Sequence, residues 1–278
     1  MVGSLDPLSG REMFERGLHI YGNILPFLRE RASSYTVFAQ ASLPEMLGEE
    51  LKQAMILEVN TLSSMVFLNR GGRLDARPLP AEAQWSPVFG LSVGDFDGDG
   101  HEDLFLAQNY SGNDLETPRS DAGRGLWLRG NGRGEFQSVP GQESGVAAYG
   151  DQRGSALADY DGDGRLDLVL TQNGSETKLY HNERARPGLR VHLKGPAGNP
   201  TGAGAVLRLQ SKAGKGYARE VHMGGGYWSV DGATQVMTSV DTPEAITVRW
   251  PDGSFATAPV PAGTKELTLT WKPKETGR

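Results

Sequence analysis

Cysteine is absent from the 278-residue chain. Disulfide bonds and thiolate metal sites are therefore excluded, but exported bacterial proteins often lack cysteine, so the compartment stays open. Long hydrophobic runs are missing too, and none approaches the roughly 20 apolar residues of a membrane-spanning helix. The first ten residues carry neither a basic stretch nor an apolar one, so no signal peptide is visible.

The sequence also lacks a surplus of basic residues. Lys and Arg number 28 against 34 Asp and Glu, which gives a formal net charge of −6. Nucleic acid and acidic membrane surfaces are therefore not expected as partners. Glycine, in contrast, is abundant at 38 residues, and 16 prolines accompany it. This composition favours tight turns and short strands over long helices.

The N-terminal segment, residues 1–60, has a different texture from the rest. Arg11–Arg31 and Leu43–Asn60 are its longest stretches without clusters of Gly and Pro. Ser42, with Glu45 three residues later, is typical of a helix N-terminus. The apolar residues that follow recur at helical spacing: Leu47, Leu51, Met55 and Ile56. We therefore expect helices here, packed against a neighbouring sheet.

A repeat follows. The pattern Asp-x-Asp-Gly-Asp-Gly-x-x-Asp occurs at residues 95–103 and again at 159–167. Upstream of each copy, Phe67–Asn69 resembles Trp127–Arg129, at a slightly shorter spacing than that between the two acidic loops. The duplicated unit is therefore a block of strands and turns, which suits a four-stranded propeller blade. Residues 61–186 are predicted to form two such blades, a partial β-propeller.

The acidic loops have the chemistry of calcium sites, because Ca²⁺ takes six to eight hard oxygen ligands. Glycines at the fourth and sixth positions permit the tight curl that turns three carboxylates toward one point. Four carboxylates within nine residues would repel one another without a cation. We expect two calcium ions, held by the aspartates and by the carbonyl of the seventh residue: Asp95, Asp97, Asp99, His101 and Asp103, then Asp159, Asp161, Asp163, Arg165 and Asp167.

An EF-hand is the main alternative for such loops. It needs flanking helices and an acidic residue at the twelfth position. That position is Leu106 in the first loop and Leu170 in the second, and both lie in strand-like runs. The EF-hand interpretation therefore fails. The histidines share no metal-ligand spacing, and we expect them at packing or surface positions: His19, His101, His181, His192 and His222.

Residues 187–278 are predicted to form a small all-β domain, since short strand-like runs alternate there with turn residues. Trp228, Trp250 and Trp271 are expected to pack its core, with stacking on a sugar as the alternative. Gln108-Asn109 and Gln172-Asn173 end matching strands. We expect their amides to satisfy the backbone of turns, with a shared polar surface as the alternative.

The repeats resemble the FG-GAP/VCBS repeats of integrin-like β-propellers, on the acidic loops and on Phe89-Gly90 before the first. The C-terminal part resembles the ASPIC/UnbV domain of cartilage acidic protein relatives, on Asn199–Ala205, Gly224–Ser229 and Val248–Gly253. The resemblance implies an extracellular or periplasmic protein with calcium bound structurally within blades. It implies no known reaction.

The expected function is that of a secreted binding or assembly module. Family propellers commonly have about seven blades, so we expect a protein partner or further blades from the same precursor or another chain to complete this one. A glycan is a further candidate ligand. The alternatives are part of an extracellular propeller enzyme (lyase, hydrolase or oxidoreductase) and a structural subunit of an extracellular polymer.

Overall fold

The computed structural model describes residues 3–113, 117–212 and 214–273. Strands dominate it and its helices are short, so the fold class is mainly β, as the sequence predicts. The chain divides into two compact units, Met1–Leu62 and Ser63–Arg278. In the described part of the chain, no helix is long and apolar enough to cross a membrane.

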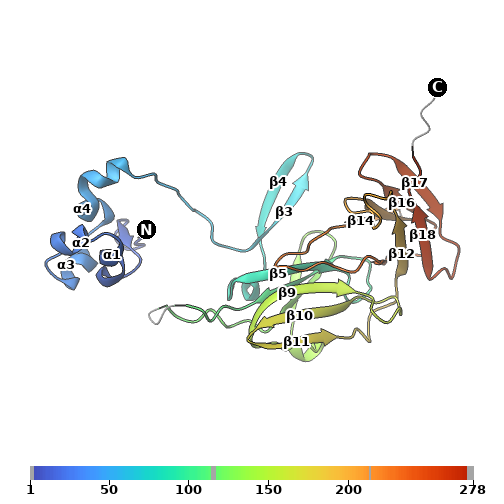
Figure 1. Ribbon diagram of the computed structural model, residues 1–278, viewed down its shortest axis with the longest axis horizontal. Helices are drawn as coiled ribbons and strands as arrows, with labels where there is room; N and C mark the ends of the chain where they lie inside the picture. The colour runs from blue at the N-terminus through green and yellow to red at the C-terminus, as the bar shows by residue number, and fades with distance from the viewer. Residues whose placement is uncertain (1–2, 114–116, 213, 274–278) are drawn as a thin grey trace, which may run out of the picture. The chain divides into compact units, whose positions relative to one another are not determined.

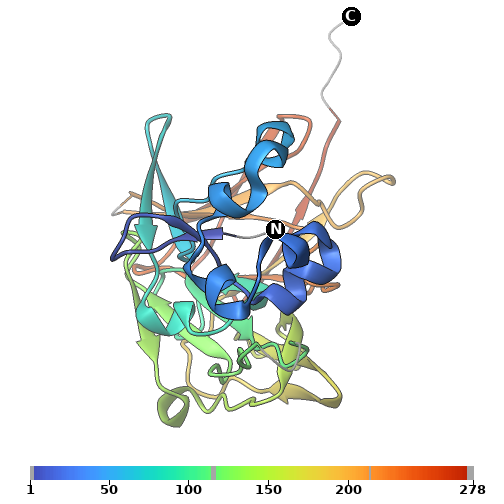
Figure 2. The same ribbon diagram turned by 90° about the vertical axis from the view of Figure 1, so that its left-hand side faces the viewer.

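The first unit is a group of short helices (blue in Figure 2) with one two-stranded hairpin. Leu28, Phe38 and Met46 are among the side chains that form its core. In chain order its elements are β1 (Gly3–Leu5), β2 (Glu12–Phe14), α1 (Leu18–Ile24), α2 (Phe27–Arg31), α3 (Tyr35–Gln40), α4 (Leu43–Leu47) and the 3₁₀ helix η1 (Gly48–Gln53).

The predicted helix start at Ser42 is confirmed. The Ser42 hydroxyl accepts from the backbone N–H of Glu45, and the Glu45 carboxylate accepts from that of Ser42, so the capping box is complete. The predicted extent to Asn60 is wrong, because Gly48 turns to φ 56° and η1 ends at Gln53. Met55 therefore lies outside any helix and is 84% exposed.

The second unit begins with a two-stranded hairpin, β3 (Met65–Arg70) and β4 (Arg73–Pro78), followed by the 3₁₀ helix η2 (Ala81–Gln84). A four-stranded antiparallel sheet comes next, its strands adjacent in chain order. They are β5 (Val88–Gly94), β6 (Asp103–Gln108), β7 (Leu126–Gly130) and β8 (Phe136–Val139). This sheet has the four strands predicted for a repeat block.

The second repeat block differs from expectation. After α5 (Gly141–Ser144), it forms a three-stranded sheet of β9 (Asp151–Ala158), β10 (Asp167–Asn173) and β11 (Ser175–Tyr180) (Figure 1). The fourth strand is lacking because the chain continues from β11 into the C-terminal strands. Among the described residues, the sheets do not close into a propeller.

The C-terminal strands form two sheets around one core, which includes Trp250 at 1% exposure. One sheet has the order β14-β13-β16-β17 and the other β15-β12-β18, where β12 and β18 run parallel. The strands are β12 (Leu189–Lys194), β13 (Val206–Ser211), β14 (Gly214–Glu220), β15 (Gln235–Met237), β16 (Ala245–Arg249), β17 (Phe255–Pro259) and β18 (Glu266–Thr270).

Of the three tryptophans predicted to pack the C-terminal core, two do so. Trp250 lies in this core and Trp271 packs against it, as expected. The prediction for Trp228 is wrong, because its side chain is 94% exposed at a tight loop where its φ is 49°. Asn109 is fully buried, and its amide donates to the Gly123 carbonyl and accepts from the Gly123 N–H, both at 2.8 Å. At Asn109, the backbone-satisfying prediction is confirmed.

Candidate metal centres

The two acidic loops occupy the same place in their sheets. The first joins β5 to β6 and the second joins β9 to β10, so each connects the first two strands of a repeat. Gly98 and Gly100 have φ of 75° and 94°, and Gly162 and Gly164 have φ of 80° and 86°. This left-handed backbone favours glycine, and it produces the tight curl expected from the sequence.

Asp95 organises the first loop from a buried position. Its carboxylate accepts from the N–H groups of Gly98 and Gly100, each at 2.7 Å, and from the Thr238 hydroxyl. Burial raises the pKa of Asp95 above its usual range. One carboxylate oxygen each from Asp95, Asp97 and Asp99 lies within 4.8 Å of the others. This group could hold a metal ion.

Asp159 has the corresponding place in the second loop, and its side chain is fully buried. Its Oδ2 atom accepts from the Gly164 N–H at 3.1 Å, whereas Oδ1 is buried and has no hydrogen-bond partner among the described residues. Such an orphaned buried carboxylate oxygen is rare, and a bound cation would satisfy it. Oxygens of Asp159, Asp161 and Asp167 lie within 4.8 Å of one another, so the donor set fits a cation.

The last aspartate of each loop ties the loop to its sheet. Asp103 accepts from the N–H groups of Phe96 at 3.0 Å and Gly130 at 2.7 Å. Asp167 accepts from those of Tyr160 at 3.2 Å and Asn182 at 2.8 Å. Burial raises the pKa of Asp103 to about 7 and also raises that of Asp167. Asp167 joins a converging group of carboxylates, whereas Asp103 joins none among the described residues.

Two parts of the chain match known protein families. Residues 95–170 match the FG-GAP-like repeat, and residues 195–276 match the domain described as ASPIC and UnbV. The chain therefore contains an FG-GAP-like repeat followed by a C-terminal ASPIC/UnbV domain. A search among curated proteins gave no match, so the likeness to cartilage acidic protein relatives stays a prediction. FG-GAP repeats are typical of extracellular proteins and of protein interaction.

Basic side chains face the acidic loops of the FG-GAP repeats. The Arg129 Nε atom lies 2.7 Å from Asp97 Oδ2, and the Arg190 Nε atom lies 2.7 Å from Asp159 Oδ2. Arg165 pairs with Asp163 in the same loop. These cations offset part of the repulsion among the carboxylates. No sequence pattern pointed to Arg129 and Arg190, because both are distant from the loops along the chain.

The UnbV domain and the segment before it pack directly on both loops. The Arg186 N–H donates to the Asp97 carbonyl at 3.3 Å, and the Gly188 N–H donates to the Gly164 carbonyl at 2.7 Å. A Cβ atom on Gly100 would lie 2.4 Å from the backbone nitrogen of Val240. The loops are therefore part of the contact between the FG-GAP repeats and the UnbV domain.

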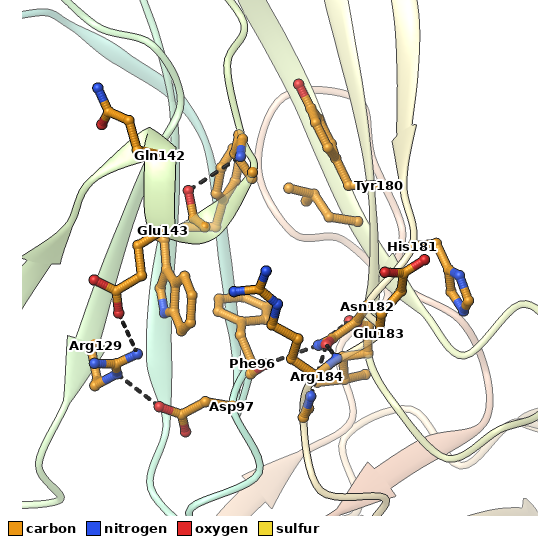
Figure 3. Close-up of a pocket in the computed structure, with 18 residues that line it drawn as sticks. Phe96, Asp97, Arg129, Gln142, Glu143, Tyr180, His181, Asn182, Glu183 and Arg184 are labelled. Carbon is orange, nitrogen blue, oxygen red and sulfur yellow. Dashed lines mark hydrogen bonds and ion pairs between the residues drawn. The ribbon is translucent and has the colours of Figure 1, made fainter.

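A pocket of about 380 Å³ lies beside the loops, between β7, α5 and the segment after β11 (Figure 3). Aromatic and aliphatic side chains form part of its lining: Phe96, Phe105, Trp127, Val146, Leu166, Leu168 and Tyr180. Charged side chains line its edge, and Arg129 there joins Asp97 to Glu143 through two ion pairs. A pocket lined by both apolar and charged side chains is a candidate site for a small organic group.

Proposed function

We propose that this protein is a secreted binding or assembly module whose two acidic loops hold structural calcium ions. The observation that carries the proposal is the buried Asp159 carboxylate, whose Oδ1 atom has no partner among the described residues and belongs to a converging group of aspartates. The first loop supports the same interpretation through Asp95, Asp97 and Asp99. The carbonyls of His101 and Arg165 are the further ligands proposed from the sequence.

When bound, calcium would neutralise the carboxylates and join parts of the loop that otherwise repel one another. The protein's own residues prepare the site. Asp95 and Asp159 fix the curl through backbone hydrogen bonds, and Asp103 and Asp167 fasten the loop to the neighbouring strand. The ion therefore has a structural role in this proposal, and no reaction is assigned to it.

The partner that we propose is a set of further propeller blades, from the same precursor or from another chain. The hairpin β3–β4 supports it, because Phe67–Asn69 in β3 resembles Trp127–Arg129 in β7. β7 pairs with β6 on one edge and β8 on the other, whereas β3 pairs only with β4 among the described strands. An open strand edge is a template for another strand. A lone monomer of 29.9 kDa in a native mass measurement would contradict this proposal.

Removal of calcium tests the main proposal. One ion at 100 times its dissociation constant contributes about 2.7 kcal/mol to the free energy of unfolding. EGTA should therefore lower the melting temperature, and Asp97→Ala and Asp161→Ala should each reproduce part of the loss. Asp121→Ala, outside the loops, is the control and should melt like the parent protein. An identical melting curve in calcium and in EGTA would reject structural calcium.

A small-molecule or enzymatic role in the pocket is the second candidate. The aromatic walls and the charged edge favour it, since an enzyme of this kind needs acidic, basic and aromatic groups around one cleft. Glycan-array binding combined with an activity screen distinguishes the two roles. Turnover of a substrate that is lost in Trp127→Ala would establish the enzyme, and binding without turnover would support the module.

A further inference from the structure

The strand registers show which residues of the two repeats are equivalent. Leu104 in β6 pairs with Leu128 in β7, and Leu168 in β10 pairs with Tyr180 in β11. Leu104 and Leu168 are equivalent in the sequence repeat, because each directly follows the last aspartate of its acidic loop. Leu128 and Tyr180 are therefore equivalent as well, and Arg129 is equivalent to His181.

The next position confirms this equivalence. The backbone N–H of Gly130 donates to Asp103 at 2.7 Å, and that of Asn182 donates to Asp167 at 2.8 Å. Arg129 and His181 thus precede residues that make the same hydrogen bond in each repeat. Their side chains also reach into the acidic loops, to Asp97 in the first and to Asp161, its equivalent, in the second.

The two side chains differ in what they can do at that position. Arg129 is positively charged, has no lone pair to give to a metal, and is held by Asp97 and Glu143. His181 carries a nitrogen that can bind a metal when the ring is neutral. Its Nε2 atom lies 3.0 Å from Asp161 Oδ2 and 3.9 Å from Asp163 Oδ2. The three side chains offer ligand atoms within 4.8 Å of one another.

Two further observations single out the second loop. The ring of Tyr160 meets the His181 ring edge to face at 5.7 Å, which limits how the imidazole turns. Asp161 belongs to the group with His181 and also to the group with the buried, incompletely paired Asp159. The imidazole therefore lies beside a carboxylate set that already fits a cation.

We propose that His181 is a nitrogen ligand of the second loop and makes it a site for Zn²⁺, with Asp161 and Asp163 as its oxygen ligands. Imidazole suits zinc and related transition ions, whereas carboxylate and carbonyl oxygens alone suit calcium. The first loop, with Arg129 in the equivalent position, takes calcium only. This inference rests on the proposed function, since it requires that the second loop binds a divalent cation.

The exchange of the two equivalent residues gives a matched test, read by calorimetric titration of the full chain with ZnCl₂ and, separately, with CaCl₂. His181→Arg copies the first repeat and should weaken zinc binding at least about tenfold while calcium binding persists. Arg129→His copies the second repeat and should add a zinc site. His222→Arg, an exposed histidine elsewhere, is the control and should leave zinc binding unchanged.

A second measurement covers the case in which a variant fails to fold. In the parent protein, zinc should shift the Nε2 resonance of His181 in a long-range ¹H–¹⁵N spectrum to the range of a metal-bound nitrogen, and calcium should not. Zinc affinity within about twofold of the parent in His181→Arg, or an Nε2 resonance that ignores zinc, overturns the inference. If calcium still binds, only this inference fails; if neither ion binds, the proposed function fails with it.

Discussion

Aspartates of one acidic loop make different contacts. Asp99 lies in the converging group of the first loop and accepts from the His101 N–H at 2.8 Å. Asp103 accepts hydrogen bonds from the backbone N–H groups of Phe96 and Gly130 and is fully buried. Asp99 should therefore stabilise the loop by binding an ion, whereas Asp103 stabilises it through hydrogen bonds to the protein backbone.

The pair Asp103→Ala and Asp99→Ala separates these roles. Asp103→Ala leaves the N–H groups of Phe96 and Gly130 without an acceptor and should cost about 2–5 kcal/mol of unfolding free energy, in calcium and in EGTA alike. Asp99→Ala should cost stability mainly in calcium. Urea denaturation of both variants in the two buffers measures the difference. Equal calcium dependence of the two variants would contradict this division.

His181 is the residue-scale feature that the sequence could not reveal. The loops were predictable because each keeps its ligands within one short segment at a fixed spacing. Arg129 lies farther along the chain from Asp97 than His181 does from Asp161. The difference arises because residues 109–125 join β6 to β7, while Gly174 alone joins β10 to β11. Only strand pairing brings the equivalent positions together.

At the scale of elements, the start of a helix could be predicted from the sequence, but its end could not. The capping box at Ser42 and Glu45 needs only neighbouring residues, and it formed as predicted. The helical spacing of Met55 and Ile56 did not produce a helix, because a helix needs packing partners for its apolar face. Both side chains are exposed. The second repeat has three described strands, because the residues that follow β11 pack into the core of the C-terminal strands instead of adding a fourth.

The capping box makes a prediction for the first unit. Ser42→Ala removes the acceptor for the Glu45 N–H and should destabilise α4 by about 1 kcal/mol. Hydrogen exchange of the full chain should show faster exchange in the helices of Met1–Leu62 and no change in the sheets of the second unit. Ser33→Ala, at an exposed position before α3, is the control. Unchanged exchange in Ser42→Ala would show that the cap contributes nothing.

At the scale of the whole second unit, the acidic loops connect the FG-GAP repeats to the UnbV domain. Asp95 receives a hydrogen bond from Thr238, and Asp159 pairs with Arg190. Each contact joins a proposed metal ligand to a residue of the C-terminal β part. Ion binding in the loops and the packing of the UnbV domain should therefore depend on each other.

Gly100 and Gly253 provide a matched test of that packing. Both have positive φ, 94° and 76°, so alanine costs about 1–2 kcal/mol at either position. At Gly100 the new Cβ would also lie 2.4 Å from Val240 N, whereas at Gly253 nothing lies within 4 Å. Gly100→Ala should therefore lose about 1–3 kcal/mol more, measured by thermal unfolding. Equal losses would show that the close contact with Val240 is unimportant.

The pairing of β12 with β18 has a consequence for synthesis. β12 begins at Leu189, but its parallel partner begins only at Glu266. At a translation rate of about 5–20 residues per second, β12 waits roughly 4–15 seconds for that partner to be made. The acidic loops leave the ribosome before both strands, and before Thr238 and Arg190 can reach them. Until those residues are made, the nascent loops lack the hydrogen bond from Thr238 and the ion pair with Arg190.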